Sequence, residues 1–298
     1  MLRGVTRAHE TIRALAPGDE AALERFLSRH ADGSMFLRSN SRTAGLRDEG
    51  ERLQGSYVAA FDAAGEVVGA AAHYRNHILV LQAPGAAGEL ARSAATESGR
   101  DVGGLVGPWS QVVEARTALG LDHRRTSLES TEDLYALELD ELRVPPALAD
   151  GRLVVCRAPA GDAELAQARA WRVAYHVEAL GSLAGPELDR AARDEIETTV
   201  ARGELWLLVD RERGMLSMTA LNARLPDVVQ VGGVYTPPEL RGRGHARAVV
   251  AGQLAALRGS GARRAVLFTE RQNRPARRAY EALGFRVVGD YGLILFEP

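Results

Sequence analysis

The chain has 298 residues, of which 46% are hydrophobic, so it is long enough to bury a core in each of about two domains. Its formal net charge of −2 excludes a basic surface spread over the whole chain, and any cationic function must therefore be local. The single cysteine, Cys156, excludes an internal disulfide, and no Cys/His set has the spacing of a structural zinc site. We therefore expect a globular protein of a reducing compartment, the cytoplasm.

The opening residues 1–20 lack an apolar core of the length that a signal peptide needs. No run of about 18 apolar residues occurs anywhere in the sequence. We therefore expect a protein that is neither exported nor inserted in a membrane.

The first half of the sequence predicts a helix, four strands and a second helix. They fall at residues 18–30, at 56–62, 66–74, 77–84 and 102–108, and at 110–120. A polar, proline-bearing stretch then separates a strand at 134–139 from one at 153–157, which predicts a domain boundary near Pro145. We expect domains at residues 1–145 and 150–298.

The second half predicts two helices, three short strands in an antiparallel meander, a helix, a strand, a helix and two closing strands. They fall at residues 162–180 and 186–203, at 204–210, 215–223 and 228–236, at 245–258, at 264–270, at 274–284, and at 285–291 and 293–298. The two halves share an order of elements, so internal duplication is the simplest account. The first half is shorter after its third strand, and what it lacks falls on a turn rich in glycine and arginine and on part of the helix that follows.

That turn precedes the third helix of the second half. A helix N-terminus leaves about four backbone N–H groups unbonded and carries roughly half a positive charge, so it is a ready anion site. Gly242 and Gly244 leave these donors uncovered, while Arg241, Arg243 and Arg247 add charge-assisted hydrogen bonds. The pattern predicts a diphosphate site, and a solvated arginine-glycine turn is the alternative. It is neither a Walker loop nor a dinucleotide fingerprint, whose third glycine is replaced by arginine.

The turn resembles the coenzyme A loop of the Gcn5-related N-acetyltransferase (GNAT) superfamily. The pattern Arg/Gln-x-x-Gly-x-Gly/Ala is met by Arg241, Gly244 and Ala246. The pattern N-x-x-A-x-x-x-Y-x-x-x-G-F is met downstream, starting at Asn273 and including Tyr280. The resemblance covers the second half well and the first half in outline.

The resemblance implies an α+β fold of two tandem GNAT-like domains, each a mixed, mostly antiparallel sheet flanked by helices. The first domain would be a degenerate copy without the pyrophosphate loop, and in it Arg116 stands where Tyr280 does and Trp109 where Asn273 does. We expect this copy to be catalytically silent. The second domain would bind acetyl-CoA and transfer its acetyl group to a primary amine in a ternary complex.

The same resemblance assigns the cofactor site and part of the chemistry. The residues expected to bind acetyl-CoA are Val234, Tyr235, Thr236, Arg241, Gly242, Arg243, Gly244, His245, Ala246, Asn273 and Tyr280. The strand carrying Val231 to Tyr235 would part from its neighbour, and the N–H of Val234 would then point at the thioester oxygen, where negative charge develops. Tyr280 would be the general acid for the departing thiolate, with an ordinary packed tyrosine as the alternative. Asn273 would fix the cofactor arm, cap the next helix, or do both.

No motif fixes the general base. Glu178 lies at helical spacing from Trp171 and Tyr175, so burial on an aromatic face is expected to raise its pKa, and a surface glutamate is the alternative. Glu204 and Asp227 are weaker candidates.

Three alternatives concern other functions or sites. A noncatalytic acyl-CoA sensor would use the same loop without turnover. An RNA-binding module is disfavoured by the acidic net charge and the scarce aromatic residues, so no nucleic-acid partner is expected. His73 and His77 are spaced as zinc ligands on a helix, but their surroundings predict strands, so no metal is expected. The acceptor, a small-molecule or peptide amine, and the oligomeric state have no sequence signal.

Overall fold

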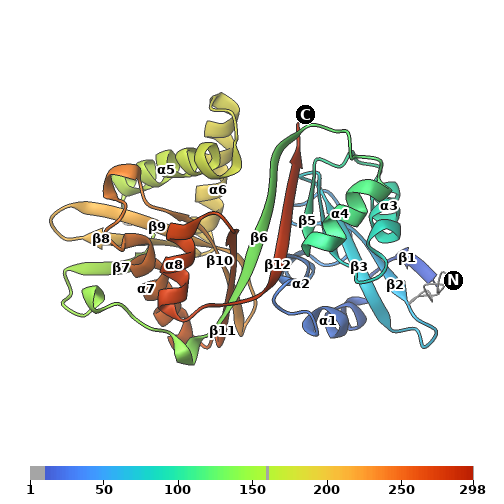
Figure 1. Cartoon of the computed structure of the whole chain (residues 1–298), viewed down its shortest axis with the longest axis horizontal. Coiled ribbons are helices and arrows are strands. Elements are labelled where there is room, and N and C mark those ends of the chain that lie inside the picture. The colour runs from blue at the N-terminus through green and yellow to red at the C-terminus, as the bar shows by residue number, and fades with distance from the viewer. Residues whose placement is uncertain (1–10, 159–160, 298) are drawn as a thin grey trace. The chain divides into compact units, whose positions relative to one another are not determined.

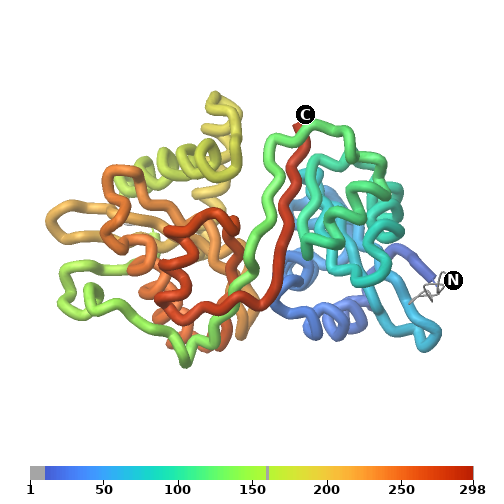
Figure 2. The backbone as a smooth tube through the Cα atoms, viewed as in Figure 1, coloured from blue at the N-terminus to red at the C-terminus, as the bar shows by residue number. Residues whose placement is uncertain are grey.

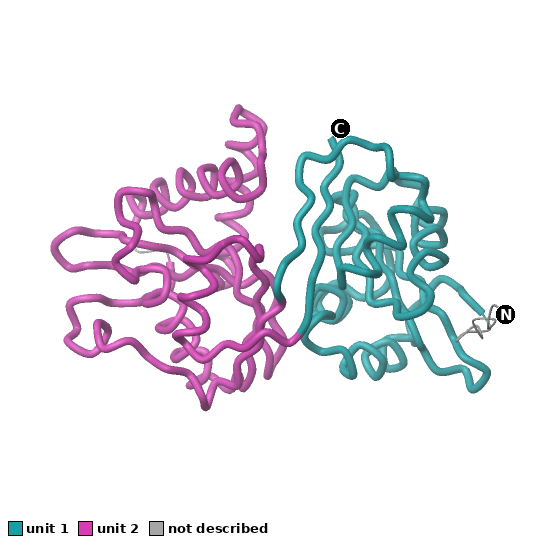
Figure 3. The backbone as a smooth tube through the Cα atoms, in the orientation of Figure 1, with its two compact units in different colours: residues 1–133, 289–298 teal, residues 134–288 magenta. Residues whose placement is uncertain are grey.

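The computed structural model describes residues 11–158 and 161–297 and divides the chain into two compact units (Figure 3). The first unit comprises Met1–Asp133 and Gly289–Pro298, and the second comprises Leu134–Val288. These limits differ from the expected domains at 1–145 and 150–298, because the chain returns to the first unit at its C-terminal end. The opening residues 1–10, in which the sequence predicts no signal peptide, lie outside the described residues.

The first unit is a sheet with helices packed on it (Figure 1). Its strand order is β1-β2-β3-β4-β5-β12, in which β4 and β5 are parallel and the other described pairs are antiparallel. Helices α3 and α4 pack on apolar side chains of β2, β3 and β4. The elements are β1 (Thr11–Ala14), α1 (Glu20–Ser28), α2 (Met35–Ala44), β2 (Gly55–Phe61), β3 (Val67–Tyr74), β4 (Ile78–Gln82), α3 (Ala87–Ser98), β5 (Gly104–Gly107) and α4 (Trp109–Ala118).

The last strand, β12 (Arg286–Phe296), completes the sheet of the first unit. It pairs antiparallel with β5, from Gly292↔Gly107 to Leu295↔Gly104, and Figure 2 follows this red segment of the chain. The prediction of two closing strands is wrong. Gly292 lies within this strand, at a place where the Trp109 ring approaches the backbone closely. A Cβ on Gly292 would lie 2.7 Å from that ring.

The second unit has the same arrangement. Strand β6 begins in the first unit and ends in the second, where the strand order continues β6-β11-β10-β9-β8-β7. The elements are β6 (Thr126–Glu138), β7 (Leu153–Arg157), α5 (Asp162–Leu180), α6 (Pro186–Ala201), β8 (Leu205–Asp210), β9 (Gly214–Arg224), β10 (Val228–Tyr235), α7 (His245–Gly259), β11 (Arg264–Glu270) and α8 (Arg274–Leu283).

The sheet of the second unit is covered on both faces. Successive side chains of a strand point to opposite faces, and β8 shows this division plainly. Trp206 and Leu208 pack with residues of α7 and α8, whereas Leu205 and Leu207 pack with residues of α5 and α6. Only β10 and β11 are parallel among the described pairs of this unit. The prediction of mixed, mostly antiparallel sheets flanked by helices is confirmed.

Candidate functional site

The candidate site of the second unit begins at an irregularity in β10. The antiparallel register with β9 shifts between Gly232 and Tyr235. Gly233, inside this shift, has a φ of +56°, a conformation that residues with a side chain rarely adopt. The strand therefore bulges at Gly233 and Val234, and these two residues are turned out of the regular ladder with β9.

On its other side, β10 pairs with β11 only along the first part of both strands. The last described pair is Gln230↔Val266, whereas β10 continues to Tyr235 and β11 to Glu270. We call these continuing segments, residues 231–235 and 267–270, the open end. An extended ligand chain can pair with the backbone at such an edge, where the carbonyl of Tyr235 already accepts from the Ser217 hydroxyl.

The open end leads into the glycine turn, residues 241–244, whose residues are all exposed. Gly242 and Gly244 have φ values of +75° and +81°, and no atom lies within 4 Å of a Cβ built on Gly242. The N–H of Ala248 donates to the carbonyl of Gly244 at the start of the 15-residue helix α7. The amides that precede Ala248 in this first turn have no intrahelical acceptor, so they are available to an anion.

The Arg241 side chain is engaged within the protein. Its Nε donates to the carbonyl oxygen of Thr236 at 2.9 Å, and its terminal nitrogens each lie 2.7 Å from a carboxylate oxygen of Glu178. Its guanidinium also lies over the ring of Tyr235, 5.8 Å from the centroid. Arg241 therefore fastens the glycine turn to α5 and β10, and the backbone of the turn is the part left open to a ligand.

Glu178 does not have the environment expected for a base. Its side chain is 48% exposed, and the hydrogen bond from Arg241 lowers its pKa below the ordinary value, against the smaller opposing effect of burial. The prediction that burial raises this pKa is wrong. Its ion-pair partner lies 63 residues further along the chain, so the helix sequence alone did not reveal it.

The remaining predicted residues of the turn lie around the start of α7. Arg243 and Arg247 are exposed, and a terminal nitrogen of Arg247 comes within 3.6 Å of a Cβ built on Gly244. Burial, assisted by the charge of Arg243, lowers the pKa of His245. Ala246 is half-buried and leaves the approach to the helix start unobstructed by a long side chain.

Asn273 and Tyr280 lie on helix α8. The Oδ1 of Asn273 accepts a hydrogen bond from the N–H of Ala276 at 3.2 Å, so Asn273 caps the helix, one of the two roles predicted for it. Tyr280 is 7% exposed and belongs to the core cluster that also contains residues of β10 and β11. Its ring lies 6.4 Å from that of Tyr135 and 6.0 Å from that of Phe285, so its orientation is fixed by aromatic neighbours.

The weaker base candidates lie at strand ends. The carbonyl of Asp227 accepts from the N–H groups of Arg263 and Arg264, which places it at the start of β10, opposite the open end. The carbonyl of Glu204 accepts from the N–H of Leu221. Both are therefore integrated into the sheet through their backbones.

The histidines and the cysteine considered in the sequence have structural surroundings. His73 is fully buried in β3, its Nδ1 lies 2.7 Å from the Ser98 hydroxyl, and burial lowers its pKa to about 4. His77 adopts a positive φ of 65° in the turn before β4. Burial raises the pKa of the half-buried Cys156 thiol. Over residues 11–158 and 161–297, no group of three His, Cys, Asp or Glu side chains is placed to hold a metal ion.

The corresponding strands of the first unit are paired almost to their ends. The last described pair of β4 and β5 is Val80↔Val106, and the strands end at Gln82 and Gly107. A Cβ on Gly107 would lie 2.7 Å from the carbonyl oxygen of Leu81, so the two backbones stay in contact beyond that pair. This unit therefore has no counterpart of the open end among its described residues.

The connection after β4 is also closed. The N–H of Ala83 donates to the side-chain oxygen of Gln111 on α4 at 2.6 Å. Helix α3 begins at Ala87, so only residues 83–86 separate it from β4, whereas residues 236–244 separate α7 from β10. A backbone donor at the end of the strand is thus satisfied from within the unit.

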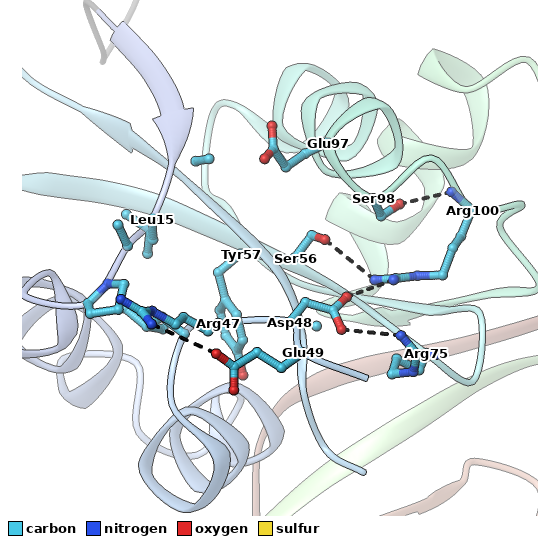
Figure 4. A pocket seen from close by; sticks show the side chains of 15 residues that line it. Leu15, Arg47, Asp48, Glu49, Ser56, Tyr57, Arg75, Glu97, Ser98 and Arg100 are labelled. Atoms are coloured by element: carbon cyan, nitrogen blue, oxygen red, sulfur yellow. Dashed lines mark hydrogen bonds and ion pairs between the residues drawn. The ribbon is translucent and has the colours of Figure 1, made fainter. Parts of the chain in front are cut away.

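The first unit instead has a polar cavity of about 590 Å³ (Figure 4). The Asp48 carboxylate lies 2.7 Å from Arg100 and 3.4 Å from Arg75. Burial opposes its ionisation, but the hydrogen bonds from Arg100 and Arg75 outweigh burial and hold the pKa of Asp48 below its ordinary value. Arg47 and Glu49 form a looser pair at 3.8 Å. These ionic side chains are thus paired with one another.

Sequence reasoning missed Arg172, which lies against the bulge of β10. Its Nη1 would be 2.5 Å from a Cβ on Gly233, and it is 3% exposed. The chain contains many arginines, and nothing in the local pattern around Trp171 distinguishes a buried one.

None of the helices in the part of the chain that the structure describes combines the length and apolar character needed to cross a membrane.

The comparisons with known proteins concern the segment that contains these elements. Residues 168–285 match the model of the Acetyltransferase (GNAT) family, and the matched segment runs from α5 through α8. No curated protein matches the chain.

Several solved structures share the fold of the whole chain. A GCN5-related N-acetyltransferase from Sphaerobacter thermophilus is 17% identical with a TM-score of 0.59, and the match covers 95% of this chain and 94% of that one. A Drosophila protein is 11% identical with a TM-score of 0.65, covering 95% and 98%. A GCN5-related N-acetyltransferase from Kribbella flavida is 17% identical with a TM-score of 0.50, covering 95% and 97%.

These matches extend over both units, and the predicted fold class of two tandem GNAT-like domains is confirmed. Proteins of this family are generally acyltransferases. Residues 168–285 therefore match the acetyltransferase (GNAT) family, within a chain whose fold is that of two tandem GNAT-like domains.

Proposed function

We propose that the second unit binds acetyl-CoA and transfers its acetyl group to a primary amine by direct attack in a ternary complex. The observation that carries the proposal is the continuity of two features: the open end of β10 and β11 runs into the exposed glycine turn at the start of α7. A ligand with an extended arm and an anionic end suits this combination. The first unit lacks both features in its described part.

The backbone of the glycine turn fits a diphosphate. Gly242 and Gly244 hold positive φ values, so an L-residue at either place would be strained and would cover the amides. Arg243 and Arg247 are exposed beside them and add positive charge. Acetyl-CoA would supply the activated acetyl group. The protein residues would bind and orient the cofactor and protonate the leaving thiolate.

The pantetheine arm would pair with the backbone of β10 from residue 231 onward. The N–H of Val234, in the bulge, would donate to the thioester oxygen and stabilise the negative charge that develops there during attack. This role needs a fixed backbone direction and not a particular side chain. Tyr235 and Thr236 would continue the wall toward the turn, where the Thr236 hydroxyl lies 2.9 Å from that of Ser217.

Tyr280 is the proposed general acid. A phenol of pKa near 10 can protonate a leaving thiolate whose own pKa is about 8.5. The aromatic rings of Tyr135 and Phe285 hold it in one orientation. Because Glu178 is paired with Arg241, we give it the role of positioning that arginine, and the acceptor ammonium would lose its proton to water.

The test is calorimetry with acetyl-CoA followed by measurement of thiol release with a panel of primary amines. We expect binding, and release of thiol only when an acceptor is present. Binding without release across the panel would favour the alternative of an acyl-CoA sensor. Absence of binding would refute both functions.

A further inference from the structure

The bulge of β10 has a buried positive charge against it. Arg172 lies on α5, is 3% exposed, and its Nη1, Nη2 and Cζ would lie 2.5, 2.6 and 2.9 Å from a Cβ on Gly233. Gly233 can be nothing larger than glycine while this guanidinium stays in place. The charge therefore lies directly beside Val234, the residue to which the proposed function assigns the thioester contact.

The guanidinium of Arg172 is incompletely paired. Its Nη1 lies 3.4 Å from the Glu195 carboxylate, longer than the 2.7–2.9 Å of a well-formed charged hydrogen bond. Its Nε is buried and has no hydrogen-bond partner. Glu195 is also shared, because its second oxygen lies 2.8 Å from His176. One carboxylate thus serves two groups, and the Nε of Arg172 is a donor that no described residue uses.

The aromatic neighbours of Arg172 keep it in place. Its Cζ lies 5.3 Å from the centroid of the Tyr175 ring, a cation–π distance. The adjacent Trp171 is buried against Tyr235 with their rings 6.2 Å apart, which anchors this turn of α5 on β10. A buried charge is costly unless it is hydrogen-bonded. An anionic group of a ligand would therefore interact more strongly with the buried Arg172 guanidinium than with a guanidinium in water.

We propose that Arg172 binds a carboxylate of the acceptor, and that the acceptors of this protein are free amino acids or similar amines with a carboxylate close to the amino group. The inference rests on the proposed function, which places the reacting carbonyl at the bulge. A guanidinium beside that carbonyl can hold a carboxylate while the neighbouring amine faces the acetyl carbon. Asn222, whose side-chain amide covers the α-carbon of Gly232, adds a neutral polar group to the same strand segment.

Matched acceptor series give the test. Each series consists of an amino acid, its amide and its decarboxylated amine, so that only the negative charge and its position change. We expect wild-type kcat/KM to be higher for the acid than for the amide by at least about 100-fold, because a site built around a hydrogen-bonded group rejects an analogue that lacks it. In Arg172→Gln the preference should fall to within about threefold, through loss of activity on the acid alone.

The matched control is Arg169→Gln. Arg169 lies on the same helix and pairs with Glu197 of α6 at 2.6 Å, so it reproduces the loss of a helix–helix ion pair without touching the bulge. Arg169→Gln should keep the preference. Arg172→Lys serves as a second variant if Arg172→Gln folds poorly, and it should retain part of the preference because the charge remains.

The outcomes separate this inference from the proposed function. If wild-type protein acetylates the amides and amines as fast as the acids, the function stands and the inference is overturned. An equal loss of activity on acid, amide and amine in Arg172→Gln overturns it as well, because the arginine would then act on the carbonyl. If calorimetry shows acids binding to the wild type but not to Arg172→Gln, and no thiol is released, the inference stands and the function falls. If no acid binds or reacts, the inference falls.

Discussion

The two units share an order of strands and helices and differ where a parallel pair of strands ends. In the first unit, β4 and β5 stay together to Val80↔Val106, and Gln111 satisfies the N–H of Ala83 beyond that pair. In the second unit the pair stops at Gln230↔Val266, well before the ends of both strands. The same architecture thus gives a paired sheet end in one copy and the open end in the other.

The difference teaches how small a change in the fold separates a unit with the open end from a unit without it. Backbone groups need partners, and the first unit supplies the N–H of Ala83 with one from the Gln111 side chain. In the second unit the described side-chain bonds at the end of β10 reach the carbonyls of Tyr235 and Thr236. Shortening the connection to residues 83–86 removes the glycine turn at the same time. The closed sheet and the absence of the proposed anion site therefore accompany the same short connection in the first unit.

The largest expected effect comes from placing a negative charge in the glycine turn. Gly244→Asp strains a residue at φ +81° and repels a diphosphate, so acetyl-CoA affinity should fall at least about 100-fold, about 2.8 kcal/mol, by calorimetry. Gly85→Asp is the matched control, because Gly85 follows β4 with a φ of +77° and open space around it. It should lower stability in the same way and leave acetyl-CoA affinity unchanged. Equal losses of acetyl-CoA affinity in both variants would contradict the assignment of cofactor binding to the second unit alone.

Removal of the Tyr280 hydroxyl is expected to have the next largest effect. Tyr280→Phe keeps the aromatic packing with Tyr135 and Phe285, so kcat should drop at least about tenfold, about 1.4 kcal/mol, while the Kd for acetyl-CoA stays nearly constant. Arg116→Gln changes the matching position of the first unit, where Arg116 pairs with Glu129 at 2.9 Å, and should not alter kcat. Unaltered turnover in Tyr280→Phe would remove the tyrosine from the mechanism.

Opening the first unit should affect stability alone. Gln111→Ala removes the acceptor of the part-buried Ala83 N–H, which should cost about 1 kcal/mol of unfolding free energy in a denaturant titration. Gln111→Glu retains a side-chain oxygen at that place and should lose less. A change in acetyl-CoA affinity in either variant would show that the closed copy takes part in cofactor binding.

The smallest effect is expected from Glu178→Gln. The pair with Arg241 is about half exposed, so its loss should raise the Kd for acetyl-CoA only a few-fold, under about 1 kcal/mol. The pKa of Glu178 is lowered from about 4.5, so the pair's contribution is complete above that value and is lost as the pH falls through the lowered pKa. The pH–rate profile near neutrality should therefore be identical in wild type and variant. Loss of a limb near neutrality would return the role of base to Glu178.

The sequence predicted most elements of both units because their periodicities are local. The helix at Asp162–Leu180 and the strand at Arg264–Glu270 begin and end where expected. Two helices of the first unit, α2 and α3, were missed. The first contains three hydroxyl or amide residues in its centre, which have low helix propensity, and the second follows a glycine and has Leu90 as its one large apolar residue.

The parts of the candidate site that the backbone forms could be predicted from the sequence. The parts that depend on contacts between distant side chains could not. The glycines at positions 242 and 244 were recognised from the sequence, and their positive φ values explain why glycine is needed there. The end of pairing at Gln230↔Val266 was expected only from the family resemblance. The ion pair of Glu178 and the burial of Arg172 depend on contacts between segments that are far apart in the sequence, and no spacing rule reveals them.

The position of β12 has a consequence for the order in which this protein can be built. The strand that completes the first sheet is synthesised after every residue of the second unit, so the earlier half emerges from the ribosome with one edge of its sheet still uncovered. A gene fragment ending near Pro145 would leave that edge permanently bare. If the halves are expressed as separate polypeptides, residues 289–298 therefore have to be joined to the first half.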